Sequence, residues 1–389
     1  MVGAGLAGLA VAWRLSRRGI RPLVLDALAD PGDGCFSGCC DGIVEVATPM
    51  LYSRAVGLLG PGRARAILEM SRENAHLIRE FAGTRDVGFR ACGAYHLTTD
   101  RAEFEELIAS WRSLPRHAGG QPAWEPLQGP SELERTHTTG FMGGVFRPED
   151  AAVDPLGFID ALTQGITECG ASVHRGVAVE AIDDGRGGRL ALRIARGVIE
   201  AEMVILAAGA GSPRLNEWLG ECLTPVLGQA VAWTGLGRMG DEAQVPVSAN
   251  FDHVRFRALP AAVGRSTDLV AGVTPWSLKG SDPQGREHRL RPELLERLER
   301  YVGDHYEPLR ARGQERPAHR WAAHAAHSID NLPVVGTLPG RPRLICCGGF
   351  SGHDWGLAFV AARDLAAAID GARLSAVLET FSPRRFIAG

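Results

Sequence analysis

Lysine is almost missing from this sequence. Among the 42 basic residues of the 389-residue chain only Lys279 is a lysine, and all the others are arginines. A mechanism that needs a catalytic lysine therefore has a single candidate. The formal net charge is −3, and no stretch forms a basic stripe, so the sequence predicts no nucleic-acid partner.

Long apolar runs are also absent. No uninterrupted run reaches the roughly 18 residues that a membrane-spanning helix needs, so the sequence predicts no transmembrane segment. Residues 1–13 are apolar, but Arg14, Arg17 and Arg18 follow them rather than precede them. This order is wrong for a secretory signal peptide, and we expect a cytoplasmic protein.

The eight cysteines include no CxxC pair. Cys35, Cys39 and Cys40 lie close together, but no histidine follows them at ligand spacing, so we expect no metal site. In a chain without a secretory signal, these cysteines are expected to be reduced thiols.

Glycine and proline are frequent, with 49 and 23 residues. Their share stays below the roughly 25–30% that marks low-complexity sequence, which indicates a loop-rich globular protein. At roughly 150 residues per domain, the length predicts two to three domains.

A glycine motif opens the chain. Residues 3–8 read Gly-Ala-Gly-Leu-Ala-Gly, and apolar residues then recur at helical spacing until Gly19 ends the pattern. A short apolar run leads to Asp26, at the distance where a carboxylate accepts a ribose hydroxyl. The glycines permit a tight turn, close approach of backbone amides to a pyrophosphate, and close helix–strand packing. The segment therefore predicts dinucleotide binding.

The strand before this motif is short. Only Met1 and Val2 precede it, whereas such a strand has about five residues and lies buried in the middle of a parallel sheet. Two interpretations remain open: either the true start lies upstream, or the protein pairs a shortened first strand.

Periodicity and turn residues predict the remaining elements. Helices are expected over 62–83, 101–113, 154–169, 292–301 and 355–370. Strands are expected over 87–98, 173–182, 189–195, 199–207 and 343–347, with a strand-rich stretch over 226–275. Residues 114–150, rich in glycine and proline, are expected to form loops.

Four segments resemble the family of FAD-dependent amine and D-amino-acid oxidoreductases, which includes glycine oxidase and sarcosine oxidase. They are residues 2–26, 153–182, 204–210, and 330–336 followed by 348–356. The second resembles the family's Val-Asp-Pro helix and the strand whose valine contacts the adenine. The last resembles a closing signature in which a glycine-rich turn enters a helix beside the flavin, where a helix N-terminus stabilises negative charge.

The resemblance implies an α/β fold with a Rossmann-like FAD-binding domain and a substrate domain built on a mainly antiparallel sheet. The FAD-binding domain would comprise 1–85, 150–215 and 325–389, and the substrate domain 86–149 and 216–324. The implied reaction is hydride transfer from the carbon that bears the amine to flavin N5, giving an imine that water hydrolyses. The implied partners are a small amine or amino-acid substrate and an electron acceptor, either oxygen or a redox partner.

The resemblance also implies which residues bind FAD and which take part in catalysis. The cofactor-binding residues would be Gly3, Gly5, Leu6, Ala7, Gly8, Asp26, Ser37, Val179, Ala208, Gly209, Gly349, Phe350, Ser351, Gly352, His353, Asp354, Trp355 and Gly356. The catalytic candidates are His353, Asp354, Trp355 and Arg257, although the family uses the segment of His353 mainly through its backbone.

Three carboxylate anchors of the family are missing here. The arginine of glycine oxidase-like members falls on Ala325, the lysine of sarcosine oxidase-like members falls on Gly356, and the usual arginine-rich stretch is replaced by residues 40–46. Arg255 and Arg257 remain as candidates, because residues i and i+2 of a strand share one face.

Two acids stand near the expected flavin. Asp354 replaces a glycine of the closing turn, and Glu45 lies in the stretch that usually carries arginines. Acids at these positions favour a cationic amine without a nearby carboxylate, and we state this as a hypothesis.

The cofactor is expected to be bound non-covalently, because Ala322 and Ala323 occupy the region where some members carry a linking cysteine. Val270 stands where sarcosine oxidases carry an oxygen-activating lysine, which weakly favours a dehydrogenase.

The leading interpretation is oxidation of the C–N bond of a small amine or amino acid. The alternatives are a D-amino-acid or N-methyl-amino-acid oxidase or dehydrogenase anchored by Arg255 or Arg257, and a flavin-binding protein with little or no turnover.

Overall fold

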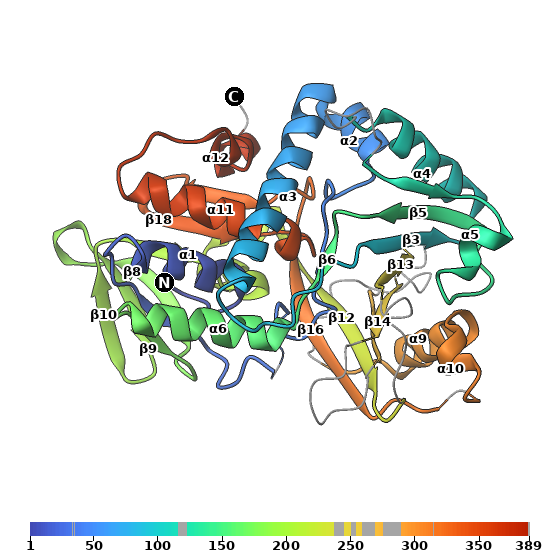
Figure 1. Ribbon diagram of the computed structural model, residues 1–389. Coiled ribbons are helices and arrows are strands. Elements are labelled where there is room, and N and C mark those ends of the chain that lie inside the picture. Colours follow the sequence, from blue (N-terminus) through green and yellow to red (C-terminus); the bar gives the residue numbers. More distant parts are fainter. Residues whose placement is uncertain are drawn as a thin grey trace.

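The computed structural model describes residues 1–32, 34, 36–115, 123–236, 245–249, 254–258, 269–274, 289–313 and 315–387. Two regions lie side by side in Figure 1, with a helix-rich region on the left and a large sheet on the right. The helices of the first region are α1 (Leu6–Ser16), α3 (Pro61–Ala82), α6 (Pro155–Glu168) and α11 (Asp354–Ile369). All four were predicted, with ends that differ by one to three residues.

A mainly parallel sheet supports these helices. Its strands are β1 (Leu23–Leu25), β7 (Ser172–His174), β11 (Val204–Leu206), β17 (Val334–Leu338) and β18 (Arg341–Gly348). Val2 bridges β1 on one side and β11 on the other, both in parallel. Its N–H donates to Ile205 O at 2.9 Å, and Ala207 N–H donates to Val2 O at 2.8 Å. Val2 thus pairs with strands on both sides, and both interpretations of the short first strand remain open.

Aromatic side chains pack the four helices against one another. Phe158 on α6 is fully buried and lies 4.9 Å from Phe81, 5.4 Å from Phe359 and 5.1 Å from Trp355, measured between ring centroids. Such aromatic contacts add to the burial of apolar area. The helix that follows the glycine motif and the helix that follows the closing turn are thereby held in one core.

A three-stranded antiparallel sheet lies at the edge of this region, formed by β8 (Val179–Asp184), β9 (Leu190–Ile194) and β10 (Gly197–Ala201). The sequence predicted strands over all three, but it merged β7 with β8 and β10 with β11. The short elements that the sequence did not predict include α2 (Tyr52–Leu59), β2 (Ile43–Val44), β6 (Ala151–Ala152), α7 (Ser212–Leu215), α8 (Glu217–Cys222), α10 (Glu307–Arg310) and α12 (Ala376–Thr380).

The second region is an eight-stranded sheet in the order β16-β12-β15-β14-β13-β3-β5-β4. All neighbours are antiparallel except β13 and β3. The strands are β16 (His319–Ser328), β12 (Leu223–Trp233), β15 (Leu269–Val273), β14 (Val254–Ala258), β13 (Val247–Ala249), β3 (Ala94–Thr98), β5 (Gly143–Arg147) and β4 (Glu125–Leu127). The predicted fold class, a mixed α/β protein with a mainly antiparallel sheet, is confirmed.

One prediction in this region is wrong. Residues 114–150 were expected to be loops, but they contain β4, β5 and the short helix α5 (Pro130–Glu134). A Cβ atom on Gly144 would stand 2.0 Å from His96 O in the neighbouring strand β3. Glycine therefore serves a close strand contact here rather than a turn, and composition alone does not distinguish the two.

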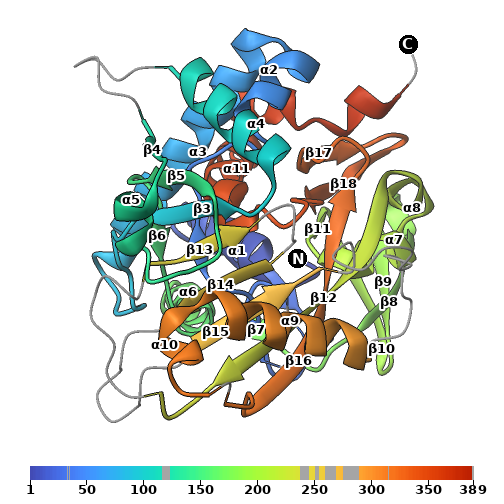
Figure 2. The same ribbon diagram turned by 90° about the vertical axis from the view of Figure 1, so that its right-hand side faces the viewer.

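The two faces of the large sheet have different coverings. On one face, Val231, Trp233 and Phe256 pack against Leu294 and Leu298 of α9 (Pro292–His305). Figure 2 shows α9 and α10 in front of these strands, and the helix α4 (Arg101–Ser113) near the top of the molecule. Because side chains alternate along each strand, Gly228, Gly272 and Ala323 lie on the opposite face, together with larger residues such as Trp321.

No described helix is long and apolar enough to span a membrane. The assignment of residues to an FAD-binding and a substrate domain remains a prediction.

Phe158→Ala is expected to lower the free energy of unfolding by about 3–5 kcal/mol, because it leaves a cavity in the aromatic core. Thermal unfolding followed by circular dichroism measures this as a lower melting temperature. Leu58→Ala is the control, because Leu58 is 75% exposed. Equal melting temperatures for the two variants would contradict the packing described.

Candidate active site

The glycine motif forms a turn that admits no side chains at two positions. Gly3 has a φ of +104°, and a Cβ atom there would lie 2.3 Å from Ala207 O. A Cβ atom on Gly8 would lie 2.1 Å from Gly3 O. Helix α1 then begins after Gly5, and no side chain caps it. Its first backbone N–H groups are thus available to an anion such as a pyrophosphate.

Asp26 lies at the end of β1 and holds this turn. Its Oδ2 accepts a hydrogen bond from Ala4 N–H, and its Oδ1 accepts one from Leu28 N–H at 2.8 Å. Each carboxylate oxygen has a further lone pair, so the predicted role at a ribose hydroxyl is compatible with these contacts. Ala208 and Gly209 follow β11, and they share the carboxyl edge of the parallel sheet with the glycine turn, where such folds bind ligands.

The closing turn connects β18 to α11. Gly349 has a φ of +65°, and a Cβ atom there would lie 2.6 Å from Leu223 Cδ2. Ser351 adopts a φ of +53° although it is not glycine. Its N–H donates to Ala326 O at 3.0 Å, and its Oγ accepts from Ser328 N–H at 3.1 Å. The turn is therefore fixed to the end of β16, and this strained conformation is the kind that occurs at functional sites.

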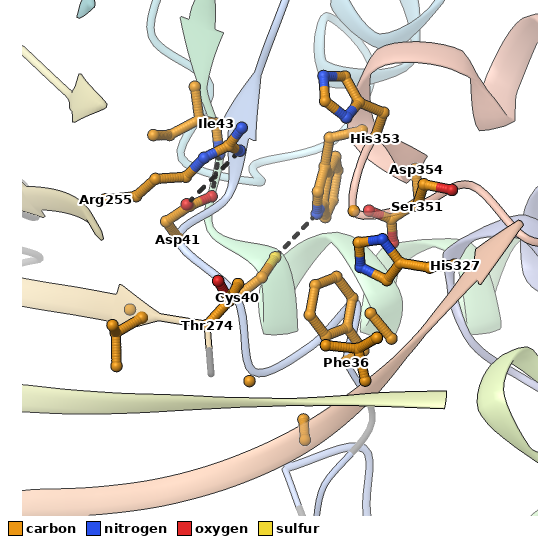
Figure 3. Close-up of a pocket in the computed structure, with 18 of the residues that line it drawn as sticks. Phe36, Cys40, Asp41, Ile43, Arg255, Thr274, His327, Ser351, His353 and Asp354 are labelled. Carbon is orange, nitrogen blue, oxygen red and sulfur yellow. Dashed lines mark hydrogen bonds and ion pairs between the residues drawn. The ribbon is translucent and has the colours of Figure 1, made fainter. Parts of the chain in front are cut away.

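A cavity of about 920 Å³ lies between the closing turn and the large sheet. Its walls include the turn from Ser351 to Trp355, the loop that contains Phe36, Cys40 and Asp41, one face of the sheet, and the segment from Pro49 to Arg54. Figure 3 shows Asp41 and Arg255 together on one side, with His327, His353 and Asp354 on the other.

The sheet contributes a floor of small side chains. Its members are Gly228, Ala230, Gly272, Ala323 and Ala325. They alternate with the core residues that pack on α9, so each strand fills one face and leaves space on the other. Ala325, where the resemblance implies an anchor arginine, lines the cavity with a methyl group. Val270, at the position of the oxygen-activating lysine, lines it as well, and Lys279 lies outside the described residues.

The start of α11 carries three of the predicted site residues. Asp354 Oδ2 accepts a hydrogen bond from Ser37 Oγ at 2.8 Å, and Trp355 Nε1 donates to Cys40 Sγ at 3.0 Å. Burial raises the pKa of the Asp354 carboxyl. Within the described part of the chain, Asp354 Oδ1 and His353 Nδ1 are buried without a hydrogen-bond partner.

These observations fit the FAD that the resemblance implies. The uncapped start of α1 and the glycine turn suit the pyrophosphate. The two orphaned polar atoms beside the cavity suit the polar edge of a flavin ring, since buried polar groups need partners.

The two candidate arginines lie on one face of β14, as their spacing predicted, but only Arg255 reaches the cavity. The Arg255 side chain is 24% exposed, and its Nη2 lies 2.8 Å from Glu45 Oε2. Arg257 is buried and donates to Val153 O at 2.8 Å. The structure therefore brings Arg255, but not Arg257, to the other catalytic candidates.

Glu45 does not offer a free negative charge to a cationic amine, contrary to our hypothesis. Besides Arg255, it contacts Arg147 Nη2 at 2.9 Å and His353 Nε2 at 3.7 Å. Burial alone raises the pKa of this carboxyl, but Arg255, Arg147 and His353 together hold it well below its usual range. The sequence did not indicate these partners, which lie far from Glu45 along the chain.

The contacts of Glu45 belong to an alternating chain of buried charges. Arg147 Nη2 also lies 2.8 Å from Asp150 Oδ2. Arg255 Nη1 lies 4.0 Å from Asp41 Oδ2 at the cavity wall. Burial, opposed by Arg147 and assisted by the charge of Glu45, raises the pKa of Asp150 to about 7.

His327 is a cavity residue that sequence reasoning missed. Burial and, to a smaller extent, His353 lower its pKa to about 4, which favours a neutral imidazole. In the sequence, residues 321–328 drew attention only because Ala325 replaces the family's anchor arginine. The available signal was the strand period, because Trp321, Ala323, Ala325 and His327 alternate along β16 and all line the cavity.

Gly8→Ala is expected to abolish retention of the dinucleotide, because the new Cβ atom would collide with Gly3 O. Visible flavin absorbance of the purified protein measures the bound cofactor. Gly57→Ala is a matched control, because Gly57 lies on α2 and a Cβ atom there would have no neighbouring atom within 4 Å, and alanine favours a helix. Full flavin content in the first variant would refute the role of the glycine turn.

The chain is similar in sequence to known proteins. The chain is 29% identical over 223 residues to an opine oxidase subunit from Rhizobium meliloti, a match that covers 57% of this chain and 58% of that protein. The chain thus spans less than two thirds of this relative.

Solved structures share the fold. Glycine oxidase from Geobacillus kaustophilus superimposes with a TM-score of 0.78 at 20% identity, over 100% of this chain and 98% of that one. Iminodiacetate oxidase from Chelativorans sp. BNC1 superimposes with a TM-score of 0.74 at 20% identity, over 98% of both chains. The model of the FAD dependent oxidoreductase family, DAO, matches residues 1–368. The chain therefore belongs to this family of FAD-dependent oxidoreductases.

Proposed function

We propose that this protein oxidises the C–N bond of an amino acid or another amine that carries a carboxylate, and that Arg255 binds the carboxylate. The observation that carries the proposal is the position of Arg255 on the cavity wall, beside the start of α11. A guanidinium presents paired N–H groups that match a carboxylate. The contact with Glu45 uses Nη2, and Nη1 lies 4.0 Å from Asp41 Oδ2 at the cavity wall.

The other candidate positions for an anchor lack a suitable group. Ala325 has no charge, and a Cβ atom on Gly356 would already lie 3.1 Å from Glu45 O. Arg54 lines the cavity, but two of its nitrogens are bound to Glu106. Arg255 is therefore the described arginine best able to bind a substrate carboxylate.

The names of similar proteins support an amino-acid substrate. One relative is called an opine oxidase subunit, and the two solved structures are called glycine oxidase and iminodiacetate oxidase. Glycine and iminodiacetate both carry a carboxylate next to the carbon that bears nitrogen.

The residues of this chain bind and orient the substrate. When bound, FAD accepts the hydride at N5, and the resulting imine is hydrolysed by water. Arg255 binds the substrate carboxylate, and the ion pair with Glu45 holds the guanidinium in position. Burial lowers the pKa of His327. Burial also lowers the pKa of His353, although the neighbouring Glu45 carboxylate opposes this effect. Phe36 and Trp355 add aromatic surface to the same cavity.

We further propose that FAD is held non-covalently. Ala323 lines the cavity and Ala322 precedes it, so neither side chain offers a sulfur for linkage. Acid precipitation of the holoenzyme is expected to leave the yellow flavin in the supernatant. A yellow pellet that survives denaturation would contradict this, and Cys39→Ser and Cys40→Ser variants would then identify the linkage.

Arg255→Gln is expected to lower kcat/KM for amino acids roughly 30-fold or more, because losing one partner of a desolvated charge pair costs about 2 kcal/mol or more. Arg255→Lys is expected to fall between the unmodified protein and Arg255→Gln, since lysine keeps the charge but not the planar fork. Flavin bleaching under anaerobic conditions, with a panel of amines with and without a carboxylate, provides the measurement.

Arg193→Gln is the control for this series, because Arg193 is 60% exposed on β9. Flavin content and melting temperature verify that each variant is folded. Amines without a carboxylate could bleach the flavin as fast as amino acids do, and Arg255→Gln could slow both classes equally. That result would refute Arg255 as the carboxylate anchor. If no amine bleaches the unmodified protein, the alternative of a flavin-binding protein with little turnover is favoured.

A further inference from the structure

A carboxylate stands next to the proposed anchor. Asp41 precedes β2, lines the cavity, and has a side chain that is 13% exposed. Its Oδ1 accepts a hydrogen bond from Ile43 N–H at 3.1 Å, and its Oδ2 lies 4.0 Å from Arg255 Nη1. Figure 3 shows this pair on the same wall of the cavity.

The link between Asp41 and Arg255 is the loosest of the charge chain. The inner contacts, from Asp150 through Arg147 and Glu45 to Arg255, measure 2.8 to 2.9 Å. The outer contact is more than 1 Å longer and lies where the chain meets the cavity. Opposite charges held at this distance leave room for a ligand to contact both.

We propose that Asp41 and Arg255 together bind a zwitterion, with the substrate carboxylate on Arg255 and the substrate ammonium on Asp41. The substrate class is then an α-amino acid or an N-substituted α-amino acid. This inference rests on the proposed function and narrows it.

Charge complementarity explains why a site with two opposite charges is more selective for its substrate than a site with one charge. In an α-amino acid a single carbon separates the carboxylate from the ammonium, so both charges reach neighbouring groups on one wall. A lone guanidinium attracts any carboxylate, whereas an adjacent Asp41 repels a second negative group and attracts a positive one. Partial burial strengthens both effects, because water screens them less.

No other acid that lines the described cavity is placed in this way. Asp354 Oδ2 accepts the hydrogen bond from Ser37, and Glu103 is buried 3.2 Å from His96. Arg257 is the other cation near Asp41, but it does not line the cavity. A substrate ammonium therefore has Asp41 as its partner next to the anchor.

The test uses three small probes of the same shape that cannot lose a hydride from the α-carbon. 2-Aminoisobutyrate carries both charges, pivalate replaces the ammonium with a methyl group, and tert-butylammonium replaces the carboxylate with a methyl group. Dissociation constants are measured on the holoenzyme by calorimetry and by the change in flavin absorbance. The unmodified enzyme is expected to bind 2-aminoisobutyrate roughly tenfold more tightly than either other probe.

Three variants distinguish the contribution of the Asp41 charge from that of the Arg255 charge. Asp41→Asn keeps the acceptor for Ile43 N–H and is expected to abolish the preference for 2-aminoisobutyrate over pivalate. Asp41→Glu is expected to restore part of that preference. Arg255→Gln is expected to weaken 2-aminoisobutyrate and pivalate alike. Asp183→Asn, an exposed acid on β8, is the matched control, and flavin content verifies folding.

Each outcome has a distinct meaning. If Asp41→Asn leaves the ratio of the two dissociation constants unchanged while Arg255→Gln weakens both probes, the zwitterion receptor is refuted and the carboxylate anchor stands. If Arg255→Gln weakens neither probe, or the unmodified enzyme binds neither of them, the anchor itself is refuted. A preference of the unmodified enzyme for pivalate also overturns the inference.

Discussion

The buried Glu45 carboxylate needs positively charged or hydrogen-bonding partners, and the geometry of the site depends on the elements that provide them. Arg147 comes from β5, Arg255 from β14 and His353 from the closing turn. The backbone of Glu45 is held as well, because its carbonyl accepts a hydrogen bond from Ser71 Oγ on α3 at 2.9 Å. A buried ion pair contributes little net stability, but breaking one costs about 3–5 kcal/mol. The large sheet and the helix-rich region are thus held in one relative position where the substrate is expected to bind.

The cavity itself results from strand alternation rather than from a gap between two bodies. Residues such as Val231 and Phe256 fill the face toward α9, while Gly228, Gly272 and Ala323 occupy the opposite face. A floor of glycine and alanine leaves volume that larger side chains would fill. The same alternation of side chains places Arg255 on the cavity wall. The two-residue period of the strands therefore accounts both for the open volume and for the positive charge beside it.

The sequence was most informative where a local pattern has one physical meaning. The turn at Gly3 and Gly8, the turn at Gly349 and the helix of Phe158 were predicted, because backbone strain and helical spacing are visible within a few residues. The strand β5 was missed, because the need for glycine at position 144 comes from the close approach of His96 O in another strand. The pairing of Glu45 was also not predictable, since Arg147 and Arg255 lie about 100 and 210 residues away along the chain. Only tertiary structure brings such groups together.

The scarcity of lysine has a consequence for acid–base chemistry. Every basic side chain among the described residues is an arginine or a histidine, and a guanidinium stays protonated at any physiological pH. The cations of the cavity wall can attract and orient a substrate, but they cannot take a proton from it. Among the described residues that line the cavity, the groups able to accept a proton from the substrate are carboxylates, imidazoles and thiols in their ionised form. The guanidinium proposed to attract the substrate carboxylate and the group that accepts a proton are therefore different side chains.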